Sequence, residues 1–194
     1  MSADRAPRRR DDARELEAIV RGTPSLMRAL TVAREVDAPD WLIGAGAVRN
    51  AVWDHLHGFT EPTPPGDVDL ASFDPLDLSR ERGQAVESAL RRRARDLPWE
   101  ATNQAAVHLW YGEDVEPLRS SAEAVATWPE TATCVAVRLE ADGRLTVVAP
   151  FGLEDLFAMI WRCNPARVTA ADSERRLASK RITERWPRVT VAAA

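Results

Sequence analysis

Two aspartates separated by one residue give the clearest chemical signal in this sequence. Asp67 and Asp69 fall in residues 67–73, where residue types alternate as they do in a β-strand. Alternate residues of a strand point to the same face, so both carboxylates should project together. Mg²⁺ typically takes one or two protein carboxylates and completes its coordination with water and phosphate. The pair therefore predicts a site for Mg²⁺, or Mn²⁺, with Asp67 and Asp69 as the metal ligands.

A glycine turn lies shortly before this strand. A short apolar run over residues 41–43 ends in the turn, and residues 47–56 then have the spacing of a helix. A turn that opens a helix presents unpaired backbone N–H groups and the positive end of the helix dipole, where phosphate binds readily. The predicted nucleotide-binding residues are therefore those of the turn and of the first helical turn: Gly44, Ala45, Gly46, Arg49 and Asn50.

The elements around these residues predict one mixed domain. Residues 1–11 are expected to be a disordered tail, and residues 12–194 a single domain. Apolar spacing and turn residues predict helices over 12–20, 24–32, 47–56, 79–95 and 172–186, and strands over 67–73, 99–111 (at least from Ala105 on), 133–139 and 144–148. Helices come first and strands then alternate with helices, which indicates an α/β or α+β domain around one sheet.

Composition and charge narrow the classes of function. The 194 residues are 45% hydrophobic and carry a formal net charge of −4, and their only lysine is Lys180. An acidic chain without a basic stripe is not expected to bind DNA sequence-specifically. No apolar run approaches the length of a membrane span, and the charged N-terminus lacks a signal-peptide core. We therefore expect a cytoplasmic protein that does not associate with membranes.

Several blocks of the sequence resemble a known superfamily. The glycine turn at a helix start, followed by an Asp-hydrophobic-Asp strand, is similar to the nucleotidyltransferase superfamily of DNA polymerase beta and the antibiotic-modifying adenylyltransferases. The chain most resembles a bacterial branch of predicted nucleotidyltransferases, itself a domain of unknown function, from about Trp41 to the C-terminal end. The matching blocks are 44–58 (GAGAVRNAVWDHLHG), 67–70 (DVDL), 73–74 (FD), 103–105 (NQA), 108–110 (HLW), 128–133 (WPETAT) and 149–157 (APFGLEDLF).

The resemblance implies a fold and an activity. The fold would be a nucleotidyltransferase-type mixed β-sheet flanked by helices, with helices before it and a helix at its C-terminal end. The activity would be metal-dependent transfer of a nucleoside monophosphate from an NTP to an unknown acceptor. Such enzymes usually add a third, catalytic carboxylate on a later strand, and Glu100 is our candidate for it beside Asp67 and Asp69. Glu100 is equally explained as an exposed acid after a proline.

The sequence also departs from the superfamily pattern. Ala45 stands where Gly or Ser is usual, and Thr102 and Ala106 stand where the branch usually has basic residues. These departures keep a second hypothesis open, in which the chain keeps the fold as a catalytically silent module that binds a nucleotide or a partner.

Overall fold

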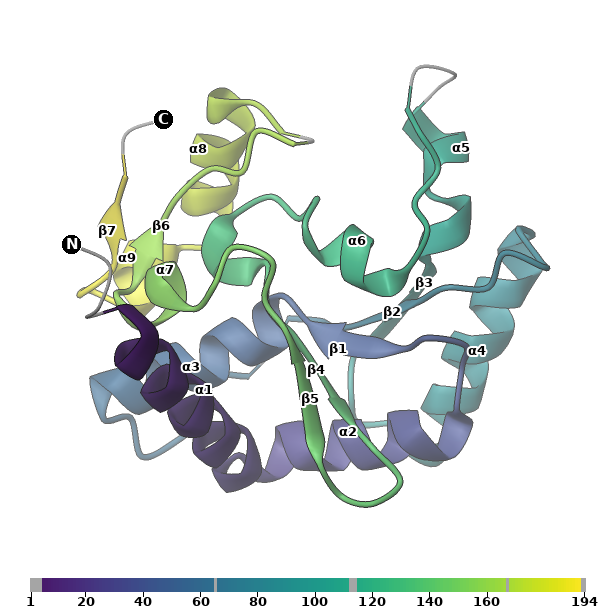
Figure 1. Ribbon diagram of the computed structural model, residues 1–194, viewed down its shortest axis with the longest axis horizontal. Helices are drawn as coiled ribbons and strands as arrows, with labels where there is room; N and C mark the ends of the chain where they lie inside the picture. Colours follow the sequence, from purple (N-terminus) through teal and green to yellow (C-terminus); the bar gives the residue numbers. More distant parts are fainter. Residues whose placement is uncertain (1–4, 65, 112–114, 167, 193–194) are drawn as a thin grey trace.

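A five-stranded mixed sheet organises the molecule (Figure 1). The structure is a computed structural model that describes residues 5–64, 66–111, 115–166 and 168–192. The strands lie in the order β3-β2-β1-β4-β5, in which only β2 and β3 pair in parallel. Their bounds are β1 (Leu42–Gly44), β2 (Val68–Ser72), β3 (Trp99–Asn103), β4 (Ala136–Leu139) and β5 (Leu145–Val148). This arrangement confirms the predicted mixed sheet flanked by helices.

Helices precede the sheet, connect its strands and follow it. They are α1 (Arg5–Gly22), α2 (Pro24–Val36), α3 (Gly46–His57), α4 (Arg80–Arg93), α5 (His108–Tyr111), α6 (Ser121–Val125), α7 (Glu154–Phe157), α8 (Ala170–Ser179) and α9 (Ile182–Arg185). The first helix thus begins at Arg5, before residue 12 where we expected it to begin. In the part of the chain that the structure describes, no helix is both long and apolar enough to cross a bilayer.

The two faces of the sheet carry separate apolar clusters. Along β1, Ile43 points into the large core shared with α1 to α4, whereas Leu42 points to the opposite face. Along β4, Val137 and Ala136 divide in the same way, as strand alternation requires. The smaller cluster includes Val125 of α6, and Figure 1 shows α2 below the sheet and α6 above it. The side of α6 is the side on which Asp67 and Asp69 project.

The strand predicted over residues 99–111 is present only at its start, as β3, and the prediction from Ala105 on is wrong. β3 ends at Asn103, and the chain continues as a 3₁₀ turn and then as α5. The Asn103 side chain accounts for this end, because its Oδ1 accepts hydrogen bonds from the N–H groups of Ala105 and Asp74. Its amide also donates to the carbonyl oxygens of Asp74 and Asp77. Asn103 thereby fastens the end of β3 to the loop after β2.

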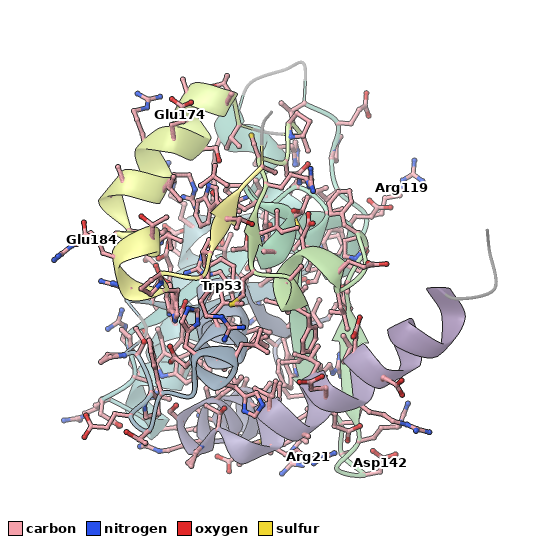
Figure 2. All side chains as sticks on the ribbon, turned by 90° about the vertical axis from the view of Figure 1, so that its left-hand side faces the viewer. Arg21, Trp53, Arg119, Asp142, Glu174 and Glu184 are labelled. Carbon is pink, nitrogen blue, oxygen red and sulfur yellow. The ribbon has the colours of Figure 1, made fainter. Side chains whose placement is uncertain are left out.

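The C-terminal segment folds back onto α3. The helix predicted over residues 172–186 is interrupted at Arg181, whose φ of +50° places it in the left-handed region. After the break, the Trp186 Nε1 donates a 2.7 Å hydrogen bond to Asp54 of α3, and its ring meets that of Trp53 edge to face. Figure 2 shows Trp53 inside the molecule, whereas Glu174 and Glu184 point outward. Trp186 therefore belongs to the same core as the glycine-turn helix α3.

Candidate active site

Three carboxylates meet where β2 and β3 begin. Asp69 lies opposite Glu100 in the parallel register of these strands, and Asp67 is two residues before Asp69 on the same face. One oxygen of each carboxylate can be chosen so that all three lie within 4.8 Å of one another. The structure thus brings the sequence-predicted pair together with Glu100, our candidate for the third carboxylate.

Proton affinity reflects the crowding of these acids. The pKa of Asp69 is raised from its usual 3.8 to about 7, chiefly by burial and then by the charges of Asp67 and Glu100, against a smaller opposing effect of Lys180 and Arg176. Three carboxylates converge here and one of them is partly desolvated, so a bound cation would stabilise their negative charge. All its donors are hard carboxylate oxygens, so they fit Mg²⁺ or Mn²⁺.

The N-terminus of α3 adjoins the carboxylates. A Cβ built on Gly46 would lie 3.6 Å from Asp67 Oδ1, so the first residue of the helix is in van der Waals reach of the acid cluster. Ala45, just before it, has φ +50° and ψ −123°, a conformation that residues with a Cβ rarely adopt. Its N–H donates to the carbonyl of Val135 on the neighbouring chain segment. This backbone hydrogen bond fixes the turn beside the carboxylates.

Gly44 has a packing role in this structure. It is the last residue of β1, and a Cβ there would lie 2.6 Å from both the ring of Trp128 and the carbonyl oxygen of Val135. Only a residue without a side chain fits between these groups. Ala45 and Gly46, by contrast, line the cavity in front of the carboxylates.

Arg49 is buried among aromatic rings. Its guanidinium carbon lies 5.3, 5.8 and 5.5 Å from the ring centroids of Trp53, Trp161 and Trp186. Burial lowers its pKa to about 10, which leaves it protonated at neutral pH. Its Nη2 donates a 2.8 Å hydrogen bond to Asn50, but its Nε is buried and has no hydrogen-bond partner among the described residues. Arg49 thus brings a desolvated positive charge to the wall of the cavity, and Asn50 orients it.

The cavity itself has a volume of about 360 Å³ and is walled by β2, β3, the start of α3 and α8. From α8 and its end come Arg176 and Lys180, which are four residues apart and so lie on one helical face. Arg176 Nε donates a 2.7 Å hydrogen bond to Glu130, which is 0% exposed. Glu130 therefore anchors Arg176 at the cavity, opposite the carboxylates.

Arg176 and Lys180 were not predicted from the sequence as residues of the site. The four-residue spacing of Arg176 and Lys180 was visible, but nothing in the sequence places a helix near the C-terminus across from Asp67. Thr102, where the related branch usually has a basic residue, also lines the cavity. Positive charge thus reaches the site from α8, whereas the residue at this position of β3 is neutral.

Comparison with known proteins gives the family. The profile of a family described as nucleotidyltransferase matches residues 31–191. A solved structure described as an NMR structure that reveals a CCA-adding enzyme head domain is 28% identical to this chain, with a TM-score of 0.79. The alignment covers 93% of this chain and 96% of that chain.

Two structures of larger chains share the fold at lower similarity. One, described as a tRNA-processing enzyme in apo form I, is 19% identical with a TM-score of 0.53 and aligns with 87% of this chain and 43% of its own. Another, described as tRNA-processing enzyme complex 3, is 19% identical with a TM-score of 0.52, over 84% of this chain and 43% of its own. This chain therefore spans less than half of their length. A search of curated proteins found no match. Because the family profile covers most of its residues, and the fold agrees, the chain belongs to the nucleotidyltransferase family.

Proposed function

We propose that this protein transfers a nucleoside monophosphate from an NTP to an acceptor hydroxyl, with a divalent cation held by Asp67 and Asp69. The observation that carries this proposal is the convergence of Asp67, Asp69 and Glu100 beside the N-terminus of α3. A phosphate-binding helix end and an oxygen-ligand metal site that share one cavity are what nucleotidyl transfer needs.

Several groups at the cavity would have a part in this reaction. Mg²⁺ or Mn²⁺ would neutralise triphosphate charge and polarise the phosphoryl group under attack. The backbone at Ala45 and Gly46 would receive the triphosphate, and Arg176 and Lys180 would offset its remaining negative charge. Catalysis would then come from positioning and charge neutralisation.

Glu100 would act as the general base. It is the exposed member of the three acids, whereas Asp67 and Asp69 are partly buried, so an acceptor can approach it from solvent. The acceptor oxygen would bond to the α-phosphorus as its proton passes to Glu100. The bond to the β-phosphate would break, and pyrophosphate would leave.

The acceptor class is proposed from similarity. The 28% identical structure is described as a CCA-adding enzyme head domain, and the two larger chains as tRNA-processing enzymes. A hydroxyl at the end of an RNA is therefore the first acceptor class to test. The acidic net charge of −4 still argues against sequence-specific DNA as a partner.

A catalytically silent nucleotide-binding module is the alternative. The strained Ala45 and the neutral Thr102 and Ala106 favour it. The presence of Glu100 within metal reach of the two aspartates, and of two cations from α8, favours the enzyme.

Calorimetry with ATP, GTP, CTP and UTP, with and without Mg²⁺, tests the proposal. We expect Mg²⁺-dependent binding that Asp67→Asn/Asp69→Asn abolishes and that Asp142→Asn, an exposed acid in the β4–β5 turn, leaves unchanged. Pyrophosphate release with an RNA acceptor should be lost in Glu100→Gln while nucleotide binding remains. Binding without any turnover would support the silent module. No binding of any nucleotide at millimolar concentration would refute the proposal that this protein alone acts as a nucleotidyltransferase.

A further inference from the structure

A second cavity adjoins the carboxylate cavity at the β3 edge of the sheet, beside α4. It has a volume of about 360 Å³ and lies between α4, β3 and α5. It will be called the edge groove, and the residues that line it and bear on its chemistry are Leu78, Arg80, Gln84, Glu87, Thr102 and Trp110.

Thr102 joins the edge groove to the candidate active site, because it lines both cavities. Thr102 is two residues after Glu100 on β3, so the two side chains point to the same face. Their positions along the strand differ by roughly 7 Å. A molecule in the edge groove can therefore present a group to Glu100, the proposed general base.

Exposed apolar side chains lie on the two segments that border this groove. Of the seven exposed large hydrophobic residues among those the structure describes, four lie in the loop before α4 or on α5: Leu76, Leu78, Leu109 and Trp110. Trp110 is 54% exposed and lines the groove together with Leu78. An indole at the rim of a groove offers a face on which a planar ring can stack.

The charges in the groove limit the kind of molecule that fits. Its one lining acid, Glu87, already accepts hydrogen bonds from Arg91 and from the N–H of Ala101. Arg80 is exposed and adds positive charge to the same wall. A polycationic acceptor would find no free carboxylate among these lining side chains, whereas a neutral molecule needs none and a phosphate can lie beside Arg80.

We propose that the edge groove is the acceptor subsite, and that its occupant is a nucleoside-type acceptor whose base stacks on Trp110. The ribose of that acceptor then lies over Thr102 and directs its hydroxyl toward Glu100. The amide of Gln84 supplies hydrogen bonds to the edge of the base. This inference rests on the nucleotidyl-transfer function proposed above and adds the chemical class of the acceptor and the residue that selects it.

Binding of adenosine tests the assignment. The protein is first saturated with Mg²⁺ and a non-hydrolysable ATP analogue, so that the carboxylate cavity is filled, and adenosine is then titrated by saturation-transfer NMR. We expect Trp110→Ala to weaken adenosine binding about tenfold, the usual scale of the loss of one base–aromatic stack, and Trp110→Phe to weaken it less. Leu109→Ala is the matched control, because this exposed neighbour on α5 is absent from the groove lining, and it should bind adenosine as the wild type does.

Two further probes define the source of the base. Pentaadenylate RNA that binds more tightly than adenosine would identify an RNA end as the occupant, and equal binding would identify a free nucleoside. Kanamycin, a polycation, should bind more weakly than either. Tighter binding of kanamycin than of adenosine would overturn the proposed chemistry of the groove.

The two proposals fail in different ways. If no NTP analogue, with any of the four bases, binds the wild type with Mg²⁺, the nucleotidyl-transfer function falls and the acceptor subsite falls with it. If another analogue binds in place of the ATP analogue, that one is used to fill the carboxylate cavity. If the analogue binds normally but adenosine binding is absent or indifferent to Trp110→Ala, the acceptor subsite alone is refuted.

Discussion

Replacing Asp69 with asparagine should remove a pH dependence from the stability of the metal-free protein. The pKa of Asp69 is about 7 in the folded chain, because the carboxylate is buried and lies beside Asp67 and Glu100. In the unfolded chain it returns to about 3.9. Between these two values the folded state holds a proton that the unfolded state has released. The folded state binds more protons there, so the free energy of unfolding falls as the pH rises.

The size of the effect follows from the shift. Each pKa unit corresponds to about 1.4 kcal/mol, so a shift of roughly three units removes about 4 kcal/mol between pH 4 and pH 8. This is a large share of the roughly 5–15 kcal/mol that stabilises a typical domain. Mg²⁺ should restore stability at pH 8, because it replaces the lost proton, and its apparent affinity should fall as the pH drops below 7.

Urea denaturation in EDTA at half-unit steps from pH 4 to pH 8 measures this. Other groups titrate in both proteins, so the quantity of interest is the difference between wild type and Asp69→Asn. Asp142→Asn should follow the wild type, because that acid is exposed and pairs with Arg144 in the β4–β5 turn. Parallel curves for wild type and Asp69→Asn would show that Asp69 does not hold a proton near neutrality. Because burial is the largest cause of the shift, Asp67→Asn should reduce the pH dependence only in part.

Three other predictions concern stability and can be measured by the same denaturation experiment. Gly44→Ala should destabilise by about 1–3 kcal/mol, because the added Cβ meets atoms at 2.6 Å, whereas Gly22→Ala, with nothing within 4 Å, should cost far less. Equal costs for the two glycines would contradict the packing role of Gly44. Arg176→Gln should cost about 3 kcal/mol or more by leaving the 0% exposed Glu130 without its cation, and Glu130→Gln should cost less because Arg176 is 35% exposed. The reverse order would contradict this view of the pair. Ala45→Gly should stabilise by about 1 kcal/mol, since glycine adopts φ +50° without strain, and a lower midpoint would count against strain at this turn.

Local patterns in the sequence predicted the carboxylate side of the site. Alternation along residues 67–73 was enough to place Asp67 and Asp69 on one face, and in the structure both line the cavity while Val68 and Leu70 belong to the large core. Glu100 was a weaker inference, because only the pairing of β2 with β3 puts it opposite Asp69. Such pairing joins segments about thirty residues apart, and no local pattern specifies it.

Side-chain hydrogen bonds between segments far apart in the sequence account for the features that the sequence did not predict. The prediction of a strand from Ala105 on was wrong because the Asn103 side chain hydrogen-bonds to the loop before α4, and β3 ends there. Arg176 reaches the cavity because a buried acid far earlier in the chain, Glu130, fixes it there. Each is a tertiary interaction between distant segments, and apolar periodicity carries no information about such bonds.

The position of Lys180 allows the cavity to be labelled chemically at one side chain. Because the sequence has no other lysine, an amine-reactive reagent can modify a side-chain amine only at Lys180, apart from the α-amino group of the chain. This amine lines the cavity that the triphosphate is proposed to occupy. Acylation followed by mass spectrometry of the peptide that contains Lys180 would therefore report occupancy of the cavity, as a mass shift that a bound nucleotide suppresses. Screening of unknown nucleotides and acceptors could then proceed by protection from labelling, without any knowledge of the product.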